Sequence, residues 1–185
     1  MADYLTAKEV AGACDVSLRT VRRWVTVFTL VTANRLAGVS LDWFWEGNVQ
    51  ASLVAHLELE GWDITNQADT ASREHGIDIV AVRHGKRLSV EVKGFPSTTY
   101  ARGERAGQPK PTQPASQARQ WFSHALLSVM LMRHKQPDAV IALAFPDYPT
   151  YRSLVDRTDL SLDLLGVGVF FVQEGGAVEA RGGIR

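Results

Sequence analysis

The sequence predicts an α/β fold of the mixed α+β kind, preceded by a small all-α module. Residues 76–94 alternate apolar and polar side chains on both sides of a short turn, as the two strands of a hairpin do. The apolar runs 139–145 and 166–172 have the length and composition of buried strands. Residues 42–60 and 116–134 repeat apolar side chains at helical spacing. Helices and strands therefore alternate along most of the chain.

The first 40 residues predict a helix-turn-helix module. Thr6 is followed three residues later by Glu9, a capping box that begins a helix over residues 5–11. Ser17 caps a second helix after a short turn. Apolar side chains would pack the two helices together, and polar and basic side chains of the second helix would project outward: Arg19, Thr20, Arg22 and Arg23. In this layout the second helix enters the major groove of DNA.

Residues 5–25 resemble the small excisionase- and regulator-type DNA-binding domains. In these domains a Lys-Glu-Val-Ala helix precedes a Val-Ser-x-Arg-Thr-Val-x-x-Trp helix, and both strings occur here. The resemblance implies that the outward-facing side chains named above, together with Ser17, bind DNA. The alternative is a helical hairpin that packs on the following domain or on a partner.

A helix, a first strand and a loop are expected next. Val49, Leu53 and Leu57 recur at helical spacing within residues 42–60. Glu46 lies in the first turn of this helix, where a carboxylate also interacts favourably with the helix dipole. Residues 62–65 predict a strand, and residues 66–75 a polar loop.

The hairpin over residues 76–94 carries charges that a buried strand does not normally hold. Asp78 lies on its first strand, Glu91 and Lys93 on its second, and His84-Gly85-Lys86 forms the turn. Antiparallel pairing would bring Asp78 near Glu91, since each lies at the strand end away from the turn. Two adjacent carboxylates repel unless a cation neutralises them. Oxygen ligands of this kind suit Mg²⁺ or Mn²⁺.

These residues resemble the PD-(D/E)xK nuclease superfamily. The family aspartate matches Asp78, the Glu-x-Lys motif matches Glu91-Val92-Lys93, and Ile77 stands where many members have proline. The resemblance implies a restriction endonuclease-like core over residues 41–185, with a mixed sheet flanked by helices. It implies that Asp78, Glu91 and the Val92 carbonyl hold the metal, that Lys93 positions the attacking water, and that Glu46 binds metal or water. The alternative is a surface hairpin with solvated charges.

The superfamily resemblance also implies a helix after the second strand, with a glutamine four residues before an aromatic residue. Gln117 and Trp121 reproduce this spacing in the helix over residues 116–134. A glutamine amide can bind a phosphate or the attacking water, and the alternative is a surface glutamine on an amphipathic helix. Beyond it, a short helix over residues 151–157 separates the two apolar strands, and a last short strand extends through Val178.

Residues 95–115 predict a flexible basic loop, since they contain four prolines and no periodicity. Arg102, Arg105 and Lys110 are its candidate DNA-binding side chains. Residues 83–119 hold eight Lys/Arg against two Glu, a net charge of +6, whereas residues 42–78 hold one Arg against eight acids, a net charge of −7. This asymmetry favours an anionic ligand near the loop. The loop either clamps DNA or is a disordered insertion.

The sequence therefore predicts a Mg²⁺-dependent DNA nuclease, an endonuclease, that its amino-terminal module targets to DNA. The alternative is a non-catalytic DNA-binding regulator or assembly module with a nuclease-like fold, and RNA or modified DNA remains open as the substrate. The resemblance leaves a homodimer open. The single cysteine, Cys14, favours a reducing, cytoplasmic compartment. Neither a signal peptide nor a membrane span is expected.

Overall fold

The computed structural model describes residues 6–13, 43–70, 76–100 and 103–184. Its contacts divide the chain into two compact units, Met1–Leu41 and Asp42–Arg185. Most of the second unit is described, and it contains the hairpin with the charged residues.

The described part of the first unit is one short helix, α1 (Ala7–Ala13). The capping box predicted before it is confirmed. The Glu9 carboxylate accepts hydrogen bonds from the backbone N–H and the hydroxyl of Thr6, both at 2.7 Å, and the Thr6 hydroxyl accepts one from the Glu9 N–H at 3.3 Å. The second predicted helix, with Ser17, Arg19, Thr20, Arg22 and Arg23, lies outside the described residues.

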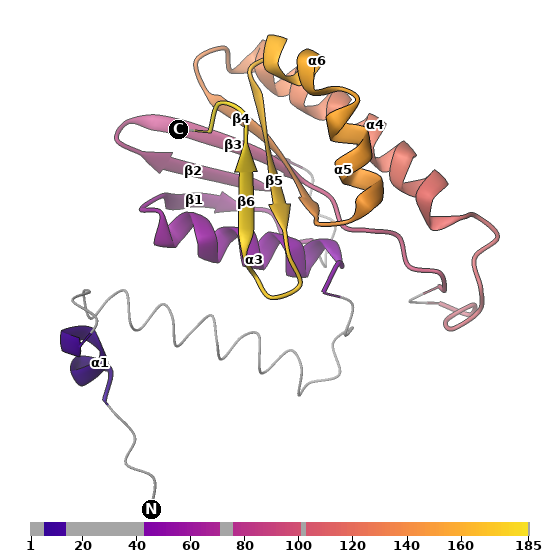
Figure 1. Ribbon diagram of the computed structural model, residues 1–185, viewed down its shortest axis with the longest axis horizontal. Coiled ribbons are helices and arrows are strands. Elements are labelled where there is room, and N and C mark those ends of the chain that lie inside the picture. Colours follow the sequence, from indigo (N-terminus) through magenta and orange to yellow (C-terminus); the bar gives the residue numbers. More distant parts are fainter. Residues whose placement is uncertain (1–5, 14–42, 71–75, 101–102, 185) are drawn as a thin grey trace, which may run out of the picture. The chain divides into compact units, whose positions relative to one another are not determined.

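The second unit is built on one mixed sheet of six strands, which lie in chain order across the sheet (Figure 1). The central strands pair in parallel, β3 with β4 and β4 with β5, and the outer pairs are antiparallel. The strands are β1 (Asp63–Gln67), β2 (Ile79–Arg83), β3 (Lys86–Val92), β4 (Val140–Pro146), β5 (Val167–Val172) and β6 (Val178–Arg181).

Helices cover both faces of this sheet (Figure 1). The helix α3 (Glu46–Leu59) buries Val49, Leu53 and Leu57 against one face. The opposite face packs against α4 (Pro114–Lys135), α5 (Pro149–Asp156) and α6 (Asp159–Leu164). Successive side chains of β4 point to opposite faces of the sheet. Ala142 and Ala144 therefore belong to the core under α3, and Ile141, Leu143 and Phe145 to the core under α4. None of the helices in the described ranges is long and apolar enough to cross a membrane.

The coarse fold prediction is confirmed: the unit is mixed α/β, and its mixed sheet is flanked by helices. Several boundaries were wrong. The first helix of the unit begins at Glu46 rather than residue 42, and α4 begins at Pro114, inside the predicted loop. The first strand extends to Gln67, and β6 extends three residues past Val178. The short helix α6 was not predicted at all.

The hairpin turn is one residue shorter than predicted. His84 and Gly85 alone have positive φ angles, 50° and 75°, and Lys86 already pairs with Arg83. A two-residue turn with both φ angles positive matches the twist of antiparallel strands, and this is why glycine follows histidine here. The pairing register then places Ile79 opposite Val90, so that Asp78 and Glu91 are the next residues along the two strands.

Residues 95–113 form no helix or long strand in their described part, as expected of a loop. They nevertheless close on themselves. Isolated bridges join Thr99 to Pro109 and Tyr100 to Ala106, and the Lys110 N–H donates to the Thr98 carbonyl at 2.8 Å. The segment is therefore a folded loop between β3 and α4.

Candidate active site

The sheet register brings Asp78 and Glu91 together where β3 ends. Asp78 immediately precedes β2, and its Oδ2 atom accepts a 2.6 Å hydrogen bond from the Val92 N–H. Glu91, which is only 8% exposed, directly precedes Val92 on β3. The Val92 N–H lies beyond the last residue pair of β2 and β3, Ile79 and Val90, and its hydrogen bond fixes the orientation of the Asp78 carboxylate.

Lys93 lies in the centre of an acidic cluster. Its Nζ atom is 2.8 Å from Glu91 Oε1, 3.9 Å from Asp78 Oδ2 and 3.8 Å from Glu46 Oε2. The same ammonium donates a 2.8 Å hydrogen bond to the Val92 carbonyl. We call Glu46, Asp78, Glu91 and Lys93 the carboxylate cluster. Three of its members lie on or beside the hairpin, and the fourth begins α3.

A close contact between β3 and α3 brings Glu46 into this cluster. A Cβ atom on Gly94 would lie 2.6 Å from the Glu46 nitrogen and 2.7 Å from the Phe44 carbonyl oxygen, so only glycine fits. The Phe95 N–H donates to the Phe44 carbonyl at 2.8 Å. The Gly94 backbone N–H also favours the ionised form of the Glu46 carboxylate, which lowers its pKa against the effect of burial. The start of α3 is thus held against the chain that follows Lys93.

The electrostatics of the cluster follow from burial and mutual repulsion. Burial, then the nearby Glu91 charge, raises the pKa of Asp78 from 3.8 to about 6. Burial also raises the pKa of Glu46, although the Lys93 ammonium opposes this. Burial alone would lower the pKa of Lys93, but the surrounding carboxylates outweigh it and the pKa lies above its ordinary value. Lys93 therefore stays protonated at neutral pH.

Two buried residues that sequence reasoning missed support the cluster. The Tyr151 hydroxyl, fully buried, donates to the Gly94 carbonyl at 2.8 Å. The Gln50 amide, on α3, donates to the Asp78 carbonyl at 2.9 Å. Gln50 could have been noticed, because it is a polar residue beside Val49 on a face of α3 that is otherwise apolar. Tyr151 gives no comparable signal, since tyrosine is common in cores.

Gln117 makes no hydrogen bond to the carboxylate cluster among the described residues. It lies in the first turn of α4, and its side-chain carbonyl oxygen is buried and accepts no hydrogen bond. Within the residues that the structure describes, no hydrogen bond joins it to Asp78, Glu91 or Lys93. Trp121 is half-buried one turn later. A phosphate or water ligand for Gln117 stays a prediction.

The basic loop residues lie partly in local contacts. Lys110 donates to the Ser97 hydroxyl at 3.1 Å, and the Arg105 guanidinium lies 5.9 Å from the centre of the Tyr100 ring. Arg105 is exposed, whereas Lys110 is half-buried. Arg102 lies outside the described residues. Arg105 is therefore more accessible to a ligand than Lys110.

The donor set of the cluster matches a hard divalent cation in its chemistry. Asp78, Glu91 and the Val92 carbonyl supply oxygen only, the ligand that Mg²⁺ and Mn²⁺ prefer. Among the side chains described, no group of three or more His, Cys, Asp or Glu is placed to hold a metal ion. Lys93 lies between these oxygens, and a metal would require its ammonium to move aside.

Comparison with known proteins identifies no relative. No family model, no curated protein and no solved structure matches the chain. The geometry of the carboxylate cluster is therefore the basis on which a function for the chain can be argued.

Proposed function

We propose that the chain is a metal-dependent nuclease that hydrolyses phosphodiester bonds of DNA, delivered to DNA by its amino-terminal module. One observation carries the proposal. Lys93 lies within 4 Å of carboxylates from Glu46, Asp78 and Glu91, which come from separate elements and meet at the end of β3. A structural core gains little from three partly buried acids around one lysine, because desolvating charges is costly.

In this proposal Asp78, Glu91 and the Val92 carbonyl hold the cation. A bound Mg²⁺ or Mn²⁺ would polarise the scissile phosphate and lower the pKa of the attacking water. The hydrogen bond from the Val92 N–H keeps one Asp78 oxygen in place. The Gln50 amide keeps the backbone of Asp78 in place through its carbonyl. Both contacts reduce the reorganisation that cation binding requires.

The raised pKa of Lys93 favours the role of a cation over that of a base. Its ammonium would orient the attacking water and offset the negative charge that develops on the phosphate. Glu46, whose pKa is raised by burial, is placed to accept the proton that the water loses. The water oxygen then forms a bond to phosphorus as the bridging P–O bond breaks, and the departing oxygen takes a proton from solvent.

A second candidate is a non-catalytic DNA-binding or assembly module. The observation that favours it is the same lysine, because the Lys93 ammonium already pairs with the Glu91 carboxylate and donates to the Val92 carbonyl. Such a cluster is stable without a metal, and it would then serve only to hold the start of α3 against the end of β3.

Cleavage assays separate the two candidates. Supercoiled, linear and branched DNA, and RNA of the same sequence, are incubated with the protein in Mg²⁺, in Mn²⁺ and in EDTA. The nuclease proposal expects products in either metal, none in EDTA, and none with Lys93→Met. Gel-shift binding with no cleavage of any substrate would instead favour the non-catalytic module.

A further inference from the structure

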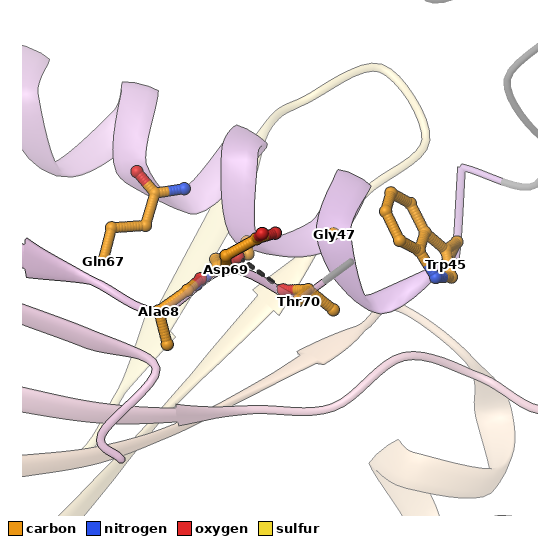
Figure 2. A pocket seen from close by; sticks show the side chains of 7 residues that line it. Trp45, Gly47, Gln67, Ala68, Asp69 and Thr70 are labelled. Atoms are coloured by element: carbon orange, nitrogen blue, oxygen red, sulfur yellow. Dashed lines mark hydrogen bonds between the residues drawn. The ribbon is translucent and has the colours of Figure 1, made fainter. Parts of the chain in front are cut away.

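A shallow pocket adjoins the carboxylate cluster. It has a volume of about 340 Å³, and Trp45 and Gly47 at the start of α3 line it together with Gln67 at the end of β1 and Asp69 and Thr70 of the segment that follows. Figure 2 shows Trp45 and Gln67 at opposite ends, with Asp69 and Thr70 between them. Protein sites for small ligands begin at about 300 Å³. Trp45 directly precedes Glu46, so the pocket and the cluster share one turn of chain.

The aromatic wall of this pocket depends on a glycine. A Cβ atom on Gly47 would lie 2.3 Å from Cζ3 and 2.4 Å from Cη2 of the Trp45 ring. The indole therefore lies against the helix backbone, where any larger residue would displace it. Trp45 is half-buried, and part of its surface lines the pocket.

The opposite wall is held by Gln50, which is only 3% exposed. Its amide nitrogen donates to the Ala68 carbonyl at 3.0 Å, and its amide oxygen accepts from the Thr70 hydroxyl at 2.7 Å. The same nitrogen donates to the Asp78 carbonyl, and the Ala68 N–H donates to that carbonyl as well, both at 2.9 Å. One buried amide thus connects the pocket wall to the strand that carries Asp78.

The charge of the lining residues restricts what the pocket can take. Among the residues that the structure describes, the lining includes no lysine, arginine or histidine, and one carboxylate, Asp69. The described lining therefore offers no cationic side chain to bind a phosphate. A neutral flat ring with hydrogen-bonding edges would stack on Trp45 and present those edges to Gln67 and Asp69, an amide and an acid that match the edges of nucleobases.

We propose that this pocket binds one unpaired nucleobase of the strand that is cut at the carboxylate cluster. The proposal rests on the proposed nuclease function and deepens it: the substrate would be single-stranded, or locally unpaired, where it crosses the site. Stacking on an aromatic side chain tolerates any base, so the pocket selects strand state rather than sequence.

Binding in EDTA tests this without turnover. Fluorescence anisotropy compares two single strands of equal length, one ordinary and one whose central nucleotides are abasic, which carry the same phosphates. Parent protein should prefer the ordinary strand on the order of tenfold, and Trp45→Ala should reduce the preference to below about twofold with little change for the abasic strand. Trp45→Phe, which keeps an aromatic ring, should retain most of it.

Gly47→Ala is the second variant, because it keeps the indole but displaces it. It should lose the preference as Trp45→Ala does, and thermal melting of each variant checks that the fold persists. The proposal is overturned if both variants keep the preference of the parent, or if both weaken the two strands equally. Mg²⁺-dependent cleavage measured in parallel distinguishes the two ideas. Cleavage without any preference for the ordinary strand would contradict the nucleobase pocket alone. A preference for the ordinary strand without cleavage would contradict the nuclease function alone.

Discussion

At the scale of single residues, the carboxylate cluster is less stable than its hydrogen bonds suggest. Asp78 must be ionised to hold a cation, yet burial and the Glu91 charge both oppose its ionisation. Ionisation of Asp78, which cation binding requires, thus lowers the stability of the folded protein at neutral pH. Sites that bind or react commonly show this conflict.

The stability of the metal-free protein should therefore fall as Asp78 ionises. Its pKa is 3.8 unfolded and about 6 folded, so the folded state binds more protons between these values, and the free energy of unfolding decreases as pH rises through them. Asp78→Asn should make the protein more stable than the parent at pH 8, by roughly 2 kcal/mol, and no more stable near pH 4. Urea unfolding in EDTA at both values measures this. Equal stability of the two proteins at pH 8 would show that Asp78 ionises without cost.

Removing the lysine should have the opposite effect. Lys93→Met leaves three carboxylates without their shared cation, and the metal-free protein should lose roughly 1–3 kcal/mol at pH 8. Mg²⁺ should recover more stability in this variant than in the parent. Lys86→Met, at an exposed position, is the matched control. Thermal melting with and without Mg²⁺ measures the difference. An identical change in stability for both variants would show that Lys93 does not neutralise the three carboxylates.

The residues of the cluster differ in how far sequence could reveal them. Asp78, Glu91 and Lys93 stand out because charges interrupt apolar alternation on neighbouring strands. Glu46 is ambiguous in sequence, since an acid in a first helical turn already has a reason to be there. Tyr151 cannot be recognised, because its bond to the Gly94 carbonyl joins residues far apart in the chain.

At the scale of elements, α3 and β3 are connected through Gly94. Nothing in the sequence near Gly94 indicates that the start of a distant helix approaches it, and the contact is visible only in three dimensions. This contact decides whether Glu46 reaches Lys93.

Gly94→Ala should separate these elements. The added methyl group would meet backbone atoms of Phe44 and Glu46, which cannot rotate away, so we expect the protein to be destabilised by roughly 2 kcal/mol or more. Gly175→Ala is the control, because a Cβ atom there meets nothing within 4 Å. Urea unfolding compares the two variants. A Gly94→Ala protein as stable as the control would mean that the helix start moves freely.

Other element errors have identifiable causes. In α6 only Leu162 is buried, whereas Leu160 and Leu164 are 69% and 80% exposed, so its residues show no helical apolar stripe. In β6 the alternation of apolar and polar residues is only four residues long, and its charged side chains are ion-paired. Arg152 bonds to Glu179, and Arg181 bonds to Glu179 and Asp156, at 2.8 Å in each case. Sequence patterns built on burial miss such elements.

At the scale of the whole molecule, we propose that the first compact unit binds DNA and that the second cleaves it. The net charge of the chain is zero, so DNA binding must come from local basic groups. The sequence assigns such groups to the loop over residues 95–115 and, in the first unit, to Arg19, Arg22 and Arg23.

That assignment predicts a salt effect. In the full chain, joint replacement of Arg19, Arg22 and Arg23 by alanine should weaken DNA binding. It should also lower the slope of log affinity against log salt by about 0.9 for each phosphate that the protein no longer neutralises. The control is Arg157→Ala, an exposed arginine of the second unit. Anisotropy titrations at several salt concentrations give both slopes. A triple variant whose slope equals that of the control would show that the first unit does not bind the phosphates.

The most direct test of the nuclease is a single isosteric change in the carboxylate cluster. Glu91→Gln keeps the size of the side chain and removes the charge that contacts Lys93, and Glu174→Gln makes the same change at an exposed position. Both are incubated with DNA and Mg²⁺ beside the parent, and initial cleavage rates are compared. We predict that Glu174→Gln cuts as the parent does and that Glu91→Gln is slower by at least about a hundredfold. A Glu91→Gln protein that cuts as fast as the parent would contradict the account.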